Sequence, residues 1–167
     1  MSDQSTSPPG LSPPHWEPID DRLLEEIYTA DQAIYPAPLL TYDRLKSWAA
    51  ACPDLCICMR RHGPESAAKG VVIVLPMRDD HWRRLIAGEL REHDVDPSDM
   101  FPPAADGAHG QSQVVKVGLH VFHVERYFFT TRDGGTASPF TPAALEEVRS
   151  RVGERFPSWE IVGYSGT

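Results

Sequence analysis

The alternation of apolar residues along residues 115–128 changes phase once, and this switch restricts the fold more than any other feature of the chain. Up to Val121 the apolar residues stand at odd positions, whereas Phe122, Val124 and Phe128 stand at even positions. Because side chains of a β-strand alternate between two faces, the switch predicts one strand with a β-bulge near Val121 and Phe122.

The predicted bulge has a chemical consequence. Before it, the face turned away from the core carries Gly118 and His120, and after it the same face carries His123 and Glu125. The sequence therefore predicts three ionisable side chains along one side of a central strand.

A glycine-rich turn and a helix follow this strand. The segment Arg132-Asp133-Gly134-Gly135-Thr136-Ala137 can direct backbone N–H groups at an anion close to the start of a helix. Thr141 and Pro142 have the residue types of a helix cap and first turn, and Trp159 to Tyr164 has the composition of a final strand. The pattern predicts a strand–helix–strand crossover.

Earlier parts of the chain contain two helices, a hairpin and a third helix. The predicted ranges are a helix from Asp20 or Asp21 to the residues before Pro36, a helix capped by Thr41, strands Leu55 to Arg60 and Val71 to Met77, and a helix from Asp80 to about Leu90. The second strand is apolar on both faces and so belongs near the middle of the sheet.

This order predicts an α/β fold with a mixed, mostly antiparallel sheet and one β-α-β crossover. Residues 1–18 contain five prolines and read as a Pro/Ser-rich disordered tail, so we expect one domain over residues 19–167.

Charge and composition exclude several classes of function. A net charge of -8 argues against general nucleic-acid binding and is compatible with a cationic or amine substrate. The sequence has neither an apolar run of roughly 18 residues nor a signal-peptide core, so we expect a soluble protein of the cytoplasm or nucleus that does not bind membranes. Cys52, Cys56 and Cys58 read as reduced thiols of the core.

The acidic segment from His93 to Asp99 has a proline where a calcium loop needs a glycine turn. It reads as a solvated loop, and we expect no metal.

Several segments resemble those of the GCN5-related N-acetyltransferase superfamily. They are Tyr28-Thr29-Ala30-Asp31-Gln32, Leu45-Lys46-Ser47-Trp48 and Leu119-His120-Val121-Phe122-His123-Val124-Glu125. The resemblance covers roughly residues 20–165. It implies two helices before an antiparallel sheet and a bulged fourth strand that receives acetyl-CoA as cosubstrate.

The phosphate-binding signature of that family is Arg or Gln, two residues, Gly, one residue, then Gly or Ala. Arg132, Gly135 and Ala137 have this spacing, while Pro139 delays the helix that should follow. The segment is therefore either a pyrophosphate cradle or a plain surface loop. The cofactor-binding residues implied by the resemblance are Val124, Arg126, Arg132, Gly134, Gly135, Thr136 and Ala137.

The resemblance implies acetyl transfer to a small amine or a peptide amine. Glu125 is then the first choice of base, directly or through a water, with His123 or His120 as alternatives. The competing interpretation is that Glu125 is the exposed end of a strand and His120 a packed residue of the core.

The family continues with a further helix and an antiparallel strand, whereas this sequence ends at Thr167. Either the sequence is truncated, or it belongs to a shortened relative whose last strand is covered by a partner protein or by a second copy in a homodimer. A non-catalytic binding or assembly module is accordingly an alternative function. Another is a different reaction that uses His120 and His123 as acid and base.

Overall fold

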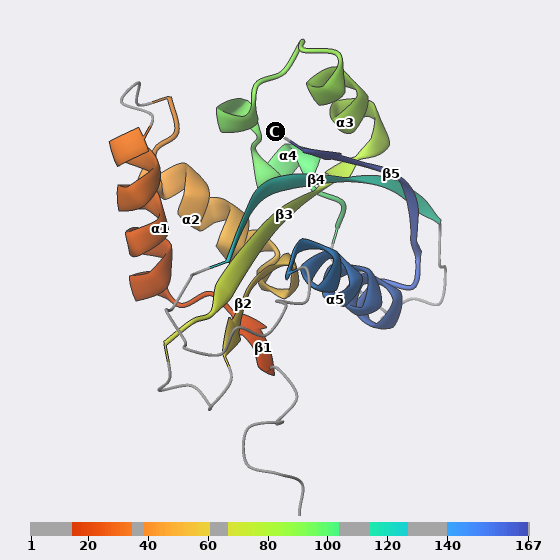
Figure 1. Cartoon of the computed structure of the whole chain (residues 1–167). Coiled ribbons are helices and arrows are strands. Elements are labelled where there is room, and N and C mark those ends of the chain that lie inside the picture. Colours follow the sequence, from red (N-terminus) through yellow and green to blue (C-terminus); the bar gives the residue numbers. More distant parts are fainter. Residues whose placement is uncertain (1–14, 35–38, 61–66, 104–113, 127–139, 167) are drawn as a thin grey trace, which may run out of the picture.

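A computed structural model describes residues 15–34, 39–60, 67–103, 114–126 and 140–166. These residues form a five-stranded mixed sheet with helices on both faces (Figure 1). The predicted α/β class is confirmed. No helix within the described ranges combines the length and the apolar character that crossing a bilayer requires.

The elements follow the predicted order, with one strand added at the start, two 3-10 helices added, and a short helix that begins within the segment from His93 to Asp99, which was predicted as a solvated loop. They are β1 (His15–Pro18), α1 (Asp21–Ile34), α2 (Tyr42–Ala51), the 3-10 helix η1 (Pro53–Leu55), β2 (Cys56–Arg60), β3 (Gly70–Arg78), α3 (Asp79–Ile86), the 3-10 helix η2 (Glu92–Asp94), α4 (Pro97–Met100), β4 (Val115–Arg126), α5 (Phe140–Arg155) and β5 (Trp159–Gly166).

Neighbouring strands in the sheet are also neighbours in the sequence. The strand order is β1-β2-β3-β4-β5, with antiparallel pairs from β1 to β4 and a parallel pair between β4 and β5. Helix α5 makes the crossover that a parallel pair requires. The predicted hairpin of β2 and β3, the central place of β3 and the β-α-β crossover are therefore confirmed.

The predicted bulge lies in β4 where the apolar alternation changes. His123 is opposite Ile73 and Val121 is opposite Val74, so Phe122 is the extra residue in β4. It uses the bulge to reach the core, because its ring packs edge-on against the Trp48 ring with centroids 5.0 Å apart.

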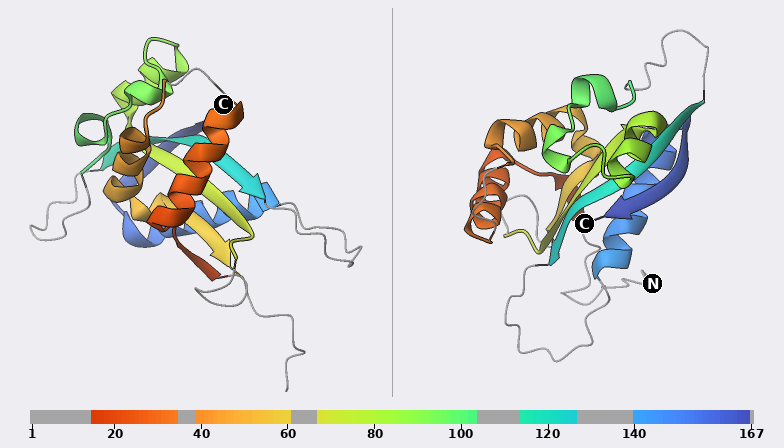
Figure 2. Two further views of the ribbon diagram at one scale, coloured as in Figure 1. Left: turned by 90° about the vertical axis from the view of Figure 1, so that its left-hand side faces the viewer. Right: turned by 90° about the horizontal axis from the view of Figure 1, so that it is seen from above.

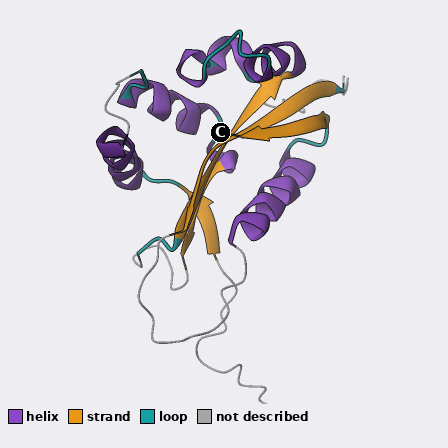
Figure 3. Cartoon of the chain, turned by 45° about the horizontal axis from the view of Figure 1, so that its top comes forward, coloured by secondary structure: helices purple, strands orange, loops and turns teal. Residues whose placement is uncertain are grey.

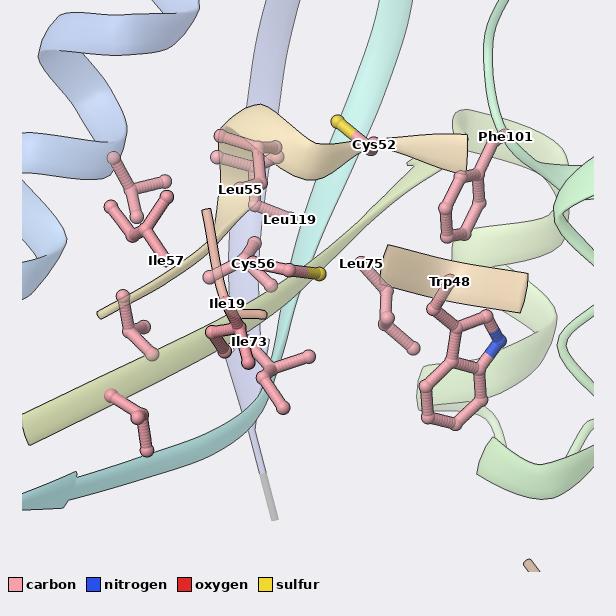
Figure 4. Close-up of a cluster of buried hydrophobic side chains, with 14 of the residues drawn as sticks. Ile19, Trp48, Cys52, Leu55, Cys56, Ile57, Ile73, Leu75, Phe101 and Leu119 are labelled. Atoms are coloured by element: carbon pink, nitrogen blue, oxygen red, sulfur yellow. The ribbon is translucent and has the colours of Figure 1, made fainter. Parts of the chain in front are cut away.

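The helices form two layers around the sheet (Figures 2 and 3). Helices α1, α2, α3 and α4 cover one face, and α5 covers the other. Buried side chains of β2, β3 and β4 pack against those of the helices, and Figure 4 shows Leu75 of β3 beside Trp48 of α2 and Phe101, which follows α4. The three cysteines are free and buried, as predicted. Burial raises the pKa of the Cys52 thiol to about 12.

Strand β1 differs from the sequence prediction, which placed residues 15–18 in the tail. It pairs antiparallel with β2, and the Trp16 ring stacks on the Phe140 ring of α5 with centroids 5.8 Å apart. Four residues that include a proline carry no strand pattern of their own. The strand forms because it pairs with β2 and packs on α5, which are distant in the sequence. As an edge strand it also tolerates Pro18.

Two helix boundaries also differ. Helix α5 begins at Phe140, so Thr141 lies inside the helix instead of capping it. Pro142 is tolerated there because N–H groups in the first turn of a helix have no intrahelical acceptor, so the missing N–H of proline costs no hydrogen bond. Helix α3 ends at Ile86, before the predicted Leu90, since the chain turns at Gly88, whose φ is 79°. By contrast, Asp20 and Thr41 accept hydrogen bonds from Leu23 N and Arg44 N at the starts of α1 and α2, as predicted.

Candidate functional site

A group of ionisable side chains lies on the face of β4 that α1 to α4 cover. The bulge makes Phe122 and His123 neighbours on this face, with ring centroids 6.4 Å apart. His120 contacts Glu92 of η2, and His123 contacts Glu125. The structure therefore places His120, His123 and Glu125 along one side of the strand.

His120 is the buried member of the group, with 5% of its surface exposed. Its Nδ1 lies 2.9 Å from Ser165 Oγ of β5, and its Nε2 lies 3.4 Å from Glu92 Oε2. Trp82 of α3 donates a hydrogen bond from Nε1 to the same Ser165 Oγ at 2.9 Å. We call Glu92, His120 and Ser165 the Glu92–His120–Ser165 network.

The chemistry of the indole fixes the direction of one of the two hydrogen bonds of Ser165. An indole N–H can only donate, so Ser165 Oγ accepts from Trp82 and keeps its own hydrogen for another acceptor. The direction of the contact between His120 and Ser165 depends on which ring nitrogen carries the proton. With the proton on Nε2, next to the Glu92 carboxylate, Nδ1 is an acceptor and Ser165 donates to it.

The segment that carries Glu92 is fastened to α2. Trp48 Nε1 donates to the carbonyl oxygen of Val95 at 2.7 Å in a buried position, and Arg44 Nη1 lies 3.8 Å from Asp96 Oδ1. Trp48 also packs against the bulge residue Phe122. One indole thus holds both the bulge of β4 and the chain next to Glu92.

The second histidine is more open. His123 Nε2 lies 3.1 Å from Glu125 Oε2, and 28% and 46% of the two side chains are exposed. Asp31 of α1 is close enough for its charge state to depend on both histidine and glutamate neighbours. Burial raises the pKa of Asp31, the charge of His123 opposes that shift, and the charge of Glu92 adds to it. This face of β4 thus has His123 and Glu125 as proton acceptors, and the carboxylates of Glu125 and Asp31 can attract a cation.

Trp82 also determines how β5 approaches β4. Its ring covers Gly118 of β4 and Gly163 of β5, and a Cβ atom added at either glycine would overlap the ring. The β4–β5 register shifts between Val117 and Gly118, directly beneath this ring. Two residues without side chains therefore create the space for the indole.

Strand β4 extends beyond the end of β5. The last pair joins Val121 to Gly166, and residues 123–126 pair with β3 but with no other strand in the described ranges. The predicted cofactor-binding residues Val124 and Arg126 lie on this stretch. Arg132, Gly134, Gly135, Thr136 and Ala137 lie outside the described residues.

Sequence reasoning did not identify Asp31, Glu92, Trp82 or Ser165 as parts of this group. Asp31 stands in a segment already noted for its resemblance, and Glu92 directly precedes the acidic segment taken as a solvated loop. The sequence around Asp31 and Glu92 does not indicate that their side chains lie on the same face of β4 as His120. Ser165 and Trp82 carry no local signal, because their contact joins residues 83 positions apart.

In the ranges that the structure describes, no three His, Cys, Asp or Glu side chains are arranged to hold a metal ion. Comparisons of the chain with protein-family models, with curated proteins and with solved structures found no match. The resemblance to the GCN5-related N-acetyltransferases accordingly stays a prediction.

Proposed function

We propose that this chain is an acetyl-CoA-dependent N-acetyltransferase that acts on a small amine or a peptide amine. The observation that carries the proposal is the bulged strand β4, with a row of ionisable side chains on one face and an edge at residues 122–126 that no described strand covers. Amide groups of an extended ligand can pair with such an edge as a further strand would.

The unpaired edge of β4 suits acetyl-CoA, and the face of β4 with the ionisable side chains suits the amine acceptor. Acetyl-CoA would supply the activated acetyl group, and the backbone at Val124, which pairs only with β3 in the described ranges, offers its amides a partner. An amine acceptor arrives as an ammonium ion, which the carboxylates of Asp31 and Glu125 attract. The chain's formal net charge of -8 favours the same kind of acceptor.

His123 and Glu125 are the best placed residues to remove a proton from the acceptor. They lie 3.1 Å apart and are partly exposed, whereas both ring nitrogens of His120 already face other side chains. A carboxylate next to an imidazole can take the proton directly or pass it between the two groups. Glu125 therefore stays the first choice of base, and His123 is its partner.

The test is calorimetric titration of the whole chain with acetyl-CoA, followed by an assay of CoA release with a panel of amines. We expect binding, and we expect Glu125→Gln to lower kcat by about a hundredfold while acetyl-CoA still binds. Glu154→Gln is the matched control, because Glu154 is an exposed glutamate of α5 on the opposite face of the sheet. A folded chain that does not bind acetyl-CoA would contradict the proposal.

A non-catalytic assembly module is the second candidate, and strand β5 favours it. Within the described residues β5 is an edge strand that pairs with β4 alone, and Tyr164 on it is 46% exposed. Exposed edges can pair with another chain. Sedimentation that gives a stable dimer, together with no acetyl-CoA binding, would favour this function over the first.

A further inference from the structure

We infer that Ser165 is a reactive hydroxyl that can accept an acyl group from an activated ester or thioester. The Glu92–His120–Ser165 network carries this inference, and it does not require the acetyl-CoA site proposed above. Its three members come from η2, β4 and β5, three elements distant in the sequence.

The arrangement has the order that nucleophile activation needs. With the His120 proton on Nε2, Ser165 Oγ donates to Nδ1 across 2.9 Å, and the carboxylate of Glu92 faces Nε2 across 3.4 Å. A hydroxyl is a weak nucleophile until a neighbouring base takes its proton, and that base works best when a third group orients it. Here His120 is the base and Glu92 is the positioning residue.

The contact between His120 and Glu92 is incomplete in this state of the protein. Nε2 and Oε2 are both buried, yet at 3.4 Å neither completes a hydrogen bond. When Nδ1 takes the serine proton, the imidazole becomes positive and its attraction to the carboxylate increases. The pair thus stabilises the charged state more than the resting state, which is the difference that accelerates a reaction.

Trp82 supports the same assignment from the opposite side. Its indole N–H donates to Ser165 Oγ and so fixes the position of this oxygen next to His120. Ser165 itself is half-buried between the exposed residues Tyr164 and Gly166, whereas His120 is buried beneath it. The nucleophile of the network is therefore open in part to solvent.

The inferred step is an acyl transfer. Ser165 Oγ attacks the acyl carbonyl carbon while its proton moves to His120 Nδ1. The bond from the acyl carbon to the leaving oxygen or sulfur then breaks, and the leaving group takes that proton from His120. The products are an acyl-serine and a free alcohol or thiol. Water, deprotonated by His120, subsequently removes the acyl group as a carboxylic acid and regenerates Ser165.

The primary test is to incubate the whole native chain with a fluorophosphonate probe, which gives a stable adduct with an activated serine, and to map the adduct by peptide mass spectrometry. We expect the adduct on Ser165. A folded chain without an adduct at Ser165 would overturn the inference, and this result does not depend on the folding of any variant.

Variants separate activation from mere accessibility. Hydrolysis of p-nitrophenyl acetate should be lost in Ser165→Ala and should fall about a hundredfold in His120→Gln. Ser158→Ala is the control, because Ser158 is also half-buried and directly precedes β5. Hydrolysis that is equal in Ser165→Ala and the native chain would also overturn the inference.

The role of Glu92 has a spectroscopic test. In the native chain, nitrogen NMR of the histidine rings should show neutral His120 with its proton on Nε2. Glu92→Gln should weaken this preference and slow labelling of Ser165 by the fluorophosphonate. A native His120 with its proton on Nδ1 would overturn the direction of the network, and with it the inference.

Discussion

The partial burial of Asp31 lowers the stability of the fold by an amount that depends on pH. Its pKa is raised in the folded protein, chiefly by burial, so the folded state keeps this proton at a pH where the unfolded chain has released it. The free energy of unfolding therefore falls as pH rises from the usual carboxyl pKa to the raised one, and the cost is constant above that window. Below the window Asp31 is protonated in both states and contributes nothing.

We expect Asp31→Asn to stabilise the protein at neutral pH by no more than about 0.5 kcal/mol, since the change is near the surface. At a pH below the carboxyl range the variant and the native chain should have equal stability. Urea unfolding at both pH values measures the difference. Glu25→Gln on the exposed side of α1 is the control, and a loss of stability in Asp31→Asn at neutral pH would contradict the prediction.

Among the elements, α3 and the β4–β5 pair fit together through one indole. The Trp82 ring occupies the space above Gly118 and Gly163, and its burial leaves it little freedom to move. A methyl group at Gly118 must displace either the ring or the strand. We expect Gly118→Ala to destabilise the protein by about 1–3 kcal/mol, the range typical of an overpacked core.

Gly153→Ala is the matched control for that substitution. Gly153 is an exposed residue of α5, and nothing lies within 4 Å of a Cβ added there. Alanine should stabilise this helix by about 0.5–1 kcal/mol. Urea unfolding of both variants gives the comparison. Equal midpoints for Gly118→Ala and the native chain would show that the indole does not pack on β4 as described.

The elements that could be predicted from the sequence are those with a pattern of their own. The phase change at Phe122 predicted the bulge, and the apolar run of β3 predicted its central place, because both depend on side-chain alternation along one strand. Strand β1 has no such pattern and forms through pairing with β2. The predicted boundary at Thr141 failed because Phe140 joins the helix, where its ring stacks on Trp16.

The candidate site was predictable only in part for the same reason. His120, His123 and Glu125 share one strand, so alternation places them on one face. Glu92 and Ser165 reach this face through η2 and β5, and their positions depend on how distant elements pack. A single sequence contains no local signal for such contacts, and the network of His120 could not be predicted.

At the scale of the whole molecule, the sheet consists of four successive antiparallel strands and a fifth strand that joins them through a crossover. Strands β1 to β4 are joined as successive antiparallel neighbours, whereas β5 pairs at one edge through a crossover and is held from above by Trp82. We expect Trp82→Ala to increase amide hydrogen exchange in β5 by at least about tenfold, which corresponds to about 1.4 kcal/mol. Exchange in β2 and β3 should change less. A uniform increase across all strands would contradict a separate role for β5.

The order of residues in the network also determines when it is complete during synthesis. Glu92 and His120 leave the ribosome before Ser165, and the four antiparallel strands can pair without it. Until β5 docks, the Nδ1 atom of His120 lacks the contact with Ser165. The nascent chain therefore carries the inferred base before its nucleophile is in place, and the two meet only when β5 pairs with β4.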